Sequence, residues 1–358
     1  MHDLHDIFIA QAATGFNEFL QTLVRSMALG SIYVMMGLGF VIIFKGTQVL
    51  NFAAAALSMA GAMIMSILIS DDGIPLLPFG NPLNNSEDPG MLTWIINLLF
   101  ALVLAAIVGL AIERFAIRPM IGQSLFAMAI ITFGIEIALR PWNIDATALE
   151  GRSLEVPWRA ETWALGESPQ PDNDNIDPIF SWWPDGLGAG SLIPKSFIAA
   201  IVMAAIAGAV VFFFFRSRFG IAMRAVAFDQ EAAMAQGINV GRVFAIAWAL
   251  GVALSALGGI AFGMAPFPPG GSVSQEVHQV LAFRVLPVIV LGGLDSVIGV
   301  IYGGLIIAAA EVFAGQYLSQ FTSVLGPGYS TVVPYLAMLV VLVVRPHGLF
   351  GTPEVRRV

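Results

Sequence analysis

The chain has no cysteine and only two lysines, Lys45 and Lys195, among its 358 residues. Without cysteine it can form no disulfide framework, no thiolate metal site and no cysteine nucleophile. A net charge of −8 argues against nucleic-acid binding, which needs clustered lysine and arginine. Charged residues make up 11% of the sequence, against about 25% in soluble domains. We therefore expect a protein whose main solvent is lipid.

Catalytic signatures are also missing from the sequence. There is no G-x-S-x-G or H-E-x-x-H motif. A Walker A loop requires glycine before its lysine, but Phe44 precedes Lys45 and Pro194 precedes Lys195. His2 and His5 would form only a terminal, mobile metal site, which we discount. We expect neither an enzyme nor a metal protein, and no cofactor bound by this chain.

Long apolar runs dominate what is present, at 58% hydrophobic residues. A membrane-spanning helix needs roughly 20 apolar residues. The pattern predicts an all-α polytopic membrane protein with about eight transmembrane helices in one domain, 1–358. The runs fall at about 27–44, 52–70, 92–112, 119–139, 195–215, 244–264, 286–313 and 332–344.

The loops between these runs carry an orientation signal, because cytoplasmic loops are enriched in lysine and arginine. Arg114, Arg118 and the stretch 216–243 are basic, as is the tail after 345. We expect these parts in the cytoplasm, including the C-terminus. The acidic loops 71–90 and 140–191 are expected outside, where the tryptophan-rich second loop would form a small cap.

The run 286–313 has a break at "GGLDSVIG". Alternation of sides requires this run to begin and end outside, so we predict two half-helices or short helices forming a broken or re-entrant element. Irregular backbone at membrane depth is tolerated where it lies inside protein or lines a cavity. Such elements are common along transport paths.

Polar residues at membrane depth are candidates for a solute path, because placing them there is costly. Two alternatives stay open. Glu136 can simply pair with Arg140 one helical turn on, and Asp295 or Ser296 can cap a following half-helix. Glycine pairs such as Gly259–Gly263 predict close helix packing and say nothing about transport. The path candidates are Asn51 and Ser58, placed seven residues apart on one helical face, with Glu136, Asp295 and Ser296.

One short charged stretch, "RAVAFDQEAAMAQGINVGRV" (224–243), interrupts the apolar sequence. Asp229 is a good helix N-cap, "QEAAMAQ" favours helix, and Gly237 is a natural terminator. A helix of about two turns is marginal in water by itself. We expect it to be docked on something, although an ordinary solvated loop helix is the alternative.

Four segments resemble one family. "EAAMAQG" resembles the E-A-A-x-x-x-G signature of ABC importer permeases, although the downstream Ile-x-Leu-Pro part is absent. With its flanks, and with "LNFAAAALSMAGA", "VIVLGGLDSVIGVIYGGLIIAAAE" and "VVRPHGLFGTPE", it resembles the permease family of branched-chain amino-acid ABC transporters. Three features depart from the family pattern: Ala54 and Ala55 replace a polar–small pair, the outer loops are longer, and Glu136 is unusual.

The resemblance implies an inner-membrane, multi-pass importer permease. Implied partners are two ABC ATPase subunits carrying ATP and Mg, a second related permease subunit and an external solute-binding protein. The expected solute is a branched-chain or related amino acid, with urea, a short amide or another small carboxylate as alternatives. An ion-coupled secondary transporter is the alternative from another class. The residues expected to couple to the ATPase are Asp229, Gln230, Glu231, Ala232, Ala233 and Gly237.

Overall fold

The computed structural model describes residues 2–69, 90–120, 122–146, 152–158, 161–165, 170, 173–180, 191–264, 272–326 and 328–351. Its helices are α1 (His2–Thr47), α2 (Ala54–Ile69), α3 (Met91–Ile112), α4 (Leu125–Ala146), α5 (Lys195–Arg216), α6 (Arg218–Phe228), α7 (Gln230–Ala235), α8 (Val240–Gly263), α9 (Gln275–Gly292), α10 (Val297–Tyr317), α11 (Thr322–Leu325) and α12 (Tyr329–Val344). A π-helical turn (Glu113–Ile117) and a 3₁₀ turn (Arg118–Met120) extend α3, and a second 3₁₀ turn (Ser319–Phe321) precedes α11. Five short strands complete the fold: β1 (Arg152–Ser153), β2 (Thr162–Leu165), β3 (Ile176–Ile179), β4 (Leu192–Pro194) and β5 (Ser272–Val273).

Five of the described helices are long and apolar enough to cross a membrane. A sixth span is counted if the bent pair Ser319–Leu325 and Tyr329–Val344 forms one element. The predicted number of about eight is therefore not confirmed. The difference arises in part because α2 is an apolar helix of only 16 residues. The five are Gly15–Thr47, Met91–Met120, Lys195–Arg216, Val240–Gly263 and Val297–Tyr317.

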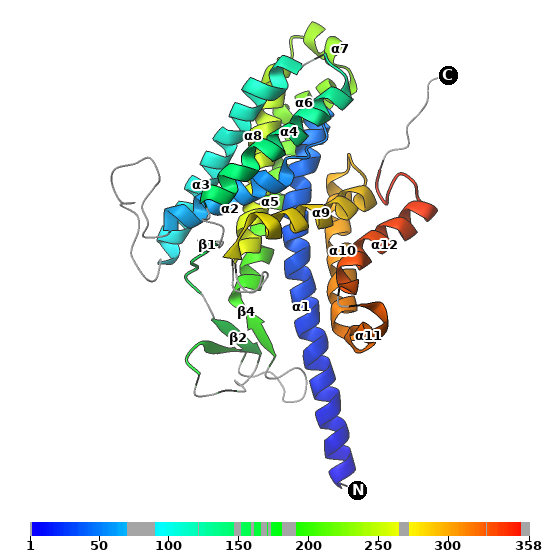
Figure 1. Ribbon diagram of the computed structural model, residues 1–358. Coiled ribbons are helices and arrows are strands. Elements are labelled where there is room, and N and C mark those ends of the chain that lie inside the picture. Colours follow the sequence, from blue (N-terminus) through cyan, green and yellow to red (C-terminus); the bar gives the residue numbers. More distant parts are fainter. Residues whose placement is uncertain are drawn as a thin grey trace.

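Helix α1 runs along the long axis of the molecule and packs against α8 and α10 (Figure 1). Its buried Tyr33 belongs to the same core as Phe244 and Trp248 of α8. Small residues let the backbones approach: a Cβ on Gly61 of α2 would overlap Ala256 of α8. In lipid, such close packing replaces the hydrophobic drive that joins helices in water. The small-residue packing predicted from sequence is thus present.

The break predicted within 286–313 lies where "GGLDSVIG" placed it. Helix α9 ends at Gly292, and the chain turns through Gly293, whose φ of 101° favours glycine, before α10 begins at Val297. Helix α10 has 21 residues and is long enough to span a membrane. The expectation of two short half-helices is therefore wrong for the second element. Helix α9 lies across α1 (Figure 1).

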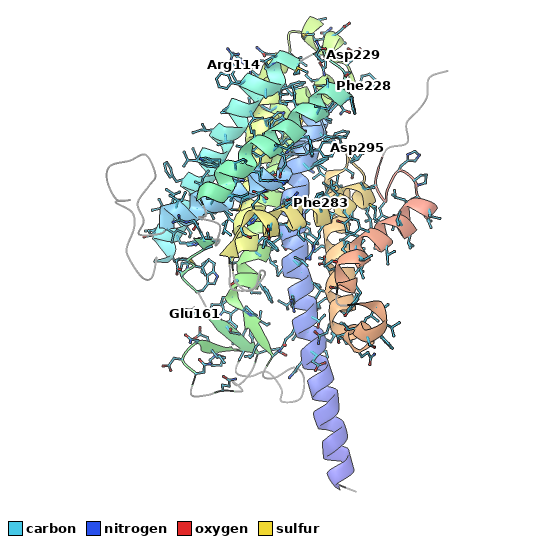
Figure 2. The ribbon with its side chains drawn as sticks, viewed as in Figure 1. Arg114, Glu161, Phe228, Asp229, Phe283 and Asp295 are labelled. Atoms are coloured by element: carbon cyan, nitrogen blue, oxygen red, sulfur yellow. The ribbon has the colours of Figure 1, made fainter. Side chains whose placement is uncertain are left out.

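The molecule has two distinct ends. Strands β3 and β2 of the predicted outer insert form a small sheet with β4, which directly follows the insert; β2 and β3 are parallel, and β2 and β4 antiparallel. This sheet lies at the end of the molecule opposite α7 (Figure 1). A second pairing joins β1 to β5, in register Arg152 with Val273. Arg114 lies near the α7 end and Glu161 at the sheet end (Figure 2), so the basic loop and the acidic insert lie at opposite ends of the molecule. Residues 71–89 and 352–358 lie outside the described part of the chain.

Candidate functional site

Helix α7 is a short helix with a defined beginning and end, as the sequence predicts. The Asp229 carboxylate accepts a hydrogen bond from the Ala232 amide at 2.9 Å. At the other end, Gly237 has φ of 81°, a conformation that glycine adopts without strain. The Ile238 amide donates to the Ala233 carbonyl at 3.0 Å, and the Gly237 amide to the Met234 carbonyl at 2.9 Å. These two bonds form a Schellman motif and fix the direction of the chain after the helix.

One side of α7 is anchored and the other is open. Ala233 is buried, whereas Phe228 is 86% exposed and Met234 52% exposed. Asp229 and Glu231 are also exposed. We call these four exposed residues, Phe228, Asp229, Glu231 and Met234, the α7 surface; Figure 2 shows Phe228 and Asp229 at the tip of the molecule. Gln230, Ala232 and Gly237, the other predicted coupling residues, lie in or beside the same helix.

An ion pair between the buried Glu113 and the partly exposed Arg118 supports this end of the molecule. The guanidinium of Arg118 donates to both carboxylate oxygens of Glu113, each at 2.9 Å, and to the Gly241 carbonyl at 3.2 Å. Asn239 caps α8 by accepting from the Arg242 amide at 3.0 Å. The first turn of α8, which follows α7, is therefore tied to the end of α3.

A second group of polar residues lies on α4, spaced by three or four residues along one face. Thr132 donates to the Leu50 carbonyl at 2.8 Å and accepts from the Phe52 amide at 3.2 Å. Asn143 donates to the Ala56 carbonyl at 3.2 Å and to Gln275 Oε1 at 2.9 Å. These side chains of α4 hydrogen-bond to the segment that leads into α2 and to the first turn of α2. The first amides of any helix have no partner within that helix, so they need acceptors from elsewhere.

Glu136 lies on the same face of α4 and is 4% exposed. Its Oε2 accepts from the Ala56 amide at 2.8 Å. Its Oε1 lies 3.8 Å from Nη2 of Arg140, within ion-pair distance but beyond hydrogen-bond reach. The predicted pairing with Arg140 is present. It leaves Oε1 without a hydrogen bond among the described residues.

Glu136 and Asn51, two of the predicted path residues, line the same cavity of about 100 Å³. Asn51 lies before α2 begins, and its Oδ1 accepts from the Ala53 amide at 3.1 Å. Arg140 was expected from the sequence only as a pairing partner, yet it also lines this cavity. The remaining walls include one more polar side chain, Gln279 of α9, and are otherwise apolar. They come from α1, α2, α4 and α9: Met36, Phe40, Ala54, Ala55, Phe133, Leu286 and Ile289 among others.

The other predicted path residues lie elsewhere. Ser58 is fully buried and donates to the Ala55 carbonyl in its own helix at 2.8 Å. Because Asn51 precedes α2, Ser58 does not share a helical face with it. Ser296 caps α10 by accepting from the Gly299 amide at 3.0 Å, which is the capping alternative named above. The carbonyl of Asp295 accepts from Lys45 Nζ at 2.8 Å.

Sequence reasoning missed one buried charged cluster. Glu311 of α10 accepts from the Tyr33 hydroxyl at 2.5 Å and pairs with Arg284 of α9 at 2.7 Å. Its side chain is 8% exposed. The signal available was a single charge inside each of two apolar runs, but which charges meet depends on helix packing. This cluster ties α1, α9 and α10 together.

Within the described residues there is no group of three or more histidine, aspartate or glutamate side chains able to hold a metal ion. The two features that remain are a cavity inside an apolar helical bundle and a short exposed helix at one end. A bundle with several span-length helices and a mainly apolar cavity that contains a few polar side chains is the class of structure expected of a membrane permease.

Comparison with known proteins agrees with that class. The model of the family "Branched-chain amino acid transport system / permease component" matches residues 22–342. The high-affinity branched-chain amino acid transport system permease protein LivH of Escherichia coli K12 is 27% identical over 344 residues, covering 96% of this chain and 99% of LivH. The permease protein BraD of Pseudomonas aeruginosa is 25% identical, covering 95% of this chain and 98% of BraD.

The chain therefore belongs to the branched-chain amino-acid ABC transporter permease family, and it is a multi-pass membrane protein. The resemblance derived from the four sequence segments is confirmed. Among solved structures, a chain of PsaBC from Streptococcus pneumoniae in complex with Fab covers 93% of this chain at 13% identity, with a TM-score of 0.41.

Proposed function

We propose that this chain is the non-catalytic, membrane-spanning subunit of an ATP-driven importer of a small polar solute. The solute is a branched-chain or related amino acid, delivered by an external solute-binding protein. A second permease subunit, identical or related, completes the pathway, and two ATPase subunits carry ATP and Mg. The chain resides in the bacterial inner membrane with its C-terminus in the cytoplasm.

The α7 surface is the observation that carries this proposal. An exposed Phe228 and Met234 are costly in water and favourable in an interface. Asp229 and Glu231 add negative charge that a basic groove on a partner would recognise. Because α7 is capped at both ends and leads directly into α8, whose first turn Arg118 ties to the end of α3, docking there transmits movement of the ATPase into the helices.

Two relatives named as branched-chain amino-acid permeases support the substrate class. The three departures from the family pattern lie where solute or its delivery protein would be met, so urea, a short amide or a small carboxylate is the second candidate. An ion-coupled transporter would require uptake driven by an ion gradient alone.

The test is co-purification of the ATPase subunits, co-expressed with the full-length permease. The Phe228→Ala, Glu231→Arg double variant should lose most of the ATPase and ATP-driven uptake, because it removes both apolar area and charge from the α7 surface. Phe321→Ala, which alters an exposed phenylalanine close to α11 at the other end (Figure 1), is the matched control and should keep both.

Retention of the ATPase and of ATP-driven uptake by the double variant would show that α7 is not the coupling element. Loss of binding by the Phe321→Ala control as well would show that the effect is not specific to α7. Uptake by the wild type that is indifferent to ATP and follows an ion gradient would favour the secondary transporter.

A further inference from the structure

The cavity between α1, α2, α4 and α9 contains three buried polar atoms that have no hydrogen-bond partner among the described residues. They are Nδ2 of Asn51, Oε1 of Glu136 and Nε of Arg140. Folded proteins leave few buried polar atoms unpaired, and an isolated one costs stability. Three of them on the lining of one cavity indicate that something else completes their hydrogen bonds.

These three groups differ in chemistry. Asn51 offers an amide donor, Arg140 a guanidinium donor and Glu136 a carboxylate acceptor. The pairing groups present thus suit a ligand that carries both an anionic and a cationic end. Glu136 and Arg140 also balance each other in charge, so the cavity has no net preference for a simple anion or cation.

Apart from the Gln279 side chain of α9, the rest of the cavity lining is apolar. Phe40 and Met36 come from α1, Phe133 from α4, and Leu286 and Ile289 from α9. Such walls stabilise an aliphatic group through burial. A cavity of about 100 Å³ is well above the roughly 10–15 Å³ that holds one water, so it has room for the aliphatic part of a small ligand.

The mouth of the cavity does not suit lipid. Arg140 keeps 39% of its side chain exposed there, and a guanidinium facing hydrocarbon is costly. Phe133 and Phe283 are more than half exposed beside it. Figure 2 shows Phe283 between the α7 end and the end with Glu161, and solute sites of transporters lie away from the two membrane surfaces. A water-filled path or a second permease subunit would cover this face.

We infer that this cavity binds a zwitterionic α-amino acid with a short aliphatic side chain, an inference that rests on the proposed function. The ammonium group donates to Oε1 of Glu136. The carboxylate accepts from Arg140 and from Nδ2 of Asn51, and the side chain lies against the apolar walls. Glu136, which departs from the family pattern, becomes a specificity residue of this chain.

The absence of native cysteine provides a direct binding assay. The Phe283→Cys variant places the only cysteine of the permease at the mouth of the cavity. It is studied in the complex of permease and ATPase, reconstituted in lipid nanodiscs with partner subunits that contain no cysteine. The rate of maleimide labelling is measured with L-leucine, with 3-methylbutylamine, which lacks the carboxylate, and with 4-methylpentanoate, which lacks the ammonium. L-Leucine should slow labelling several-fold, and each single-charge analogue should have little effect.

Adding Glu136→Gln keeps an oxygen for the Ala56 amide but removes the negative charge. Protection should then need a roughly 10- to 100-fold higher L-leucine concentration, the loss expected for a hydrogen bond to a charged group. Glu276→Gln is the matched control, because Glu276 is an exposed carboxylate on α9 away from the cavity lining, and it should leave protection unchanged.

Several results would overturn the site. These are labelling that is unaffected by L-leucine, equal protection by 4-methylpentanoate, or protection that survives Glu136→Gln. If ATP-driven uptake of L-leucine persisted alongside any of them, the proposed function would stand and only this site would fall. If L-leucine protected the introduced thiol with the predicted selectivity but uptake were independent of ATP, the site would stand without the coupling mechanism.

Discussion

Two buried carboxylates of this protein are held in different ways. Glu311 on α10 has both oxygens engaged, one by the Tyr33 hydroxyl and the other by Arg284. Glu136 on α4 has one oxygen on the Ala56 amide, while the other faces a cavity 3.8 Å from Arg140. The first arrangement is complete within the protein, so it serves the fold. The second leaves binding capacity for a ligand.

The largest loss of stability is expected on substitution of Glu311. Removing one partner of a buried ion pair leaves the other charge uncompensated, which costs about 3–5 kcal/mol. We expect Glu311→Ala to lower the free energy of unfolding by that amount, measured as a fall in the thermal midpoint of the solubilised protein. Adding Arg284→Met should restore part of the loss, because the orphaned charge is removed. A stable single variant, or a double variant no better than the single one, would contradict this structural role.

A smaller effect is expected at Asn143, which holds α2 through the Ala56 carbonyl and contacts Gln275. Asn143→Leu leaves both acceptors buried without this donor, at a cost of about 1–3 kcal/mol. Asn143→Asp is less informative because it adds charge, so Asn143→Ala serves as the second variant. If either substitution abolished L-leucine protection without loss of thermal stability, Asn143 would belong to the binding site rather than to its support.

The membrane class, the family and the ends of α7 could be predicted from the sequence because each depends on local features. Asp229 and Gly237 act through their own backbone neighbours, so their roles follow from residue type and spacing. The break before α10 was marked by its glycines and Ser296. Long apolar runs identified most helices, but the number of spans was not fixed, since α2 is shorter than the run that predicted it.

The cavity could be predicted only in part, because it depends on which helices meet. Asn51 and Glu136 are 85 positions apart in the sequence. No local sequence pattern predicts that α4 packs against the start of α2. Their common cavity became visible only with the Ala56–Glu136 hydrogen bond. Ser58 was grouped with Asn51 by assuming one continuous helix, whereas α2 begins at Ala54. Glu311 and Arg284 needed the packing of α9 on α10.

The most direct test of this difference is a paired measurement on Glu136→Gln in the reconstituted complex, where the smallest loss of stability is expected. Glutamine retains an acceptor for the Ala56 amide, so the free energy of unfolding should fall by about 1 kcal/mol or less. ATP-driven uptake of L-leucine into proteoliposomes should nevertheless fall steeply. Uptake that matches the wild type, or a loss of uptake that merely follows a loss of folding, would contradict the view that Glu311 stabilises the fold whereas Glu136 binds the solute.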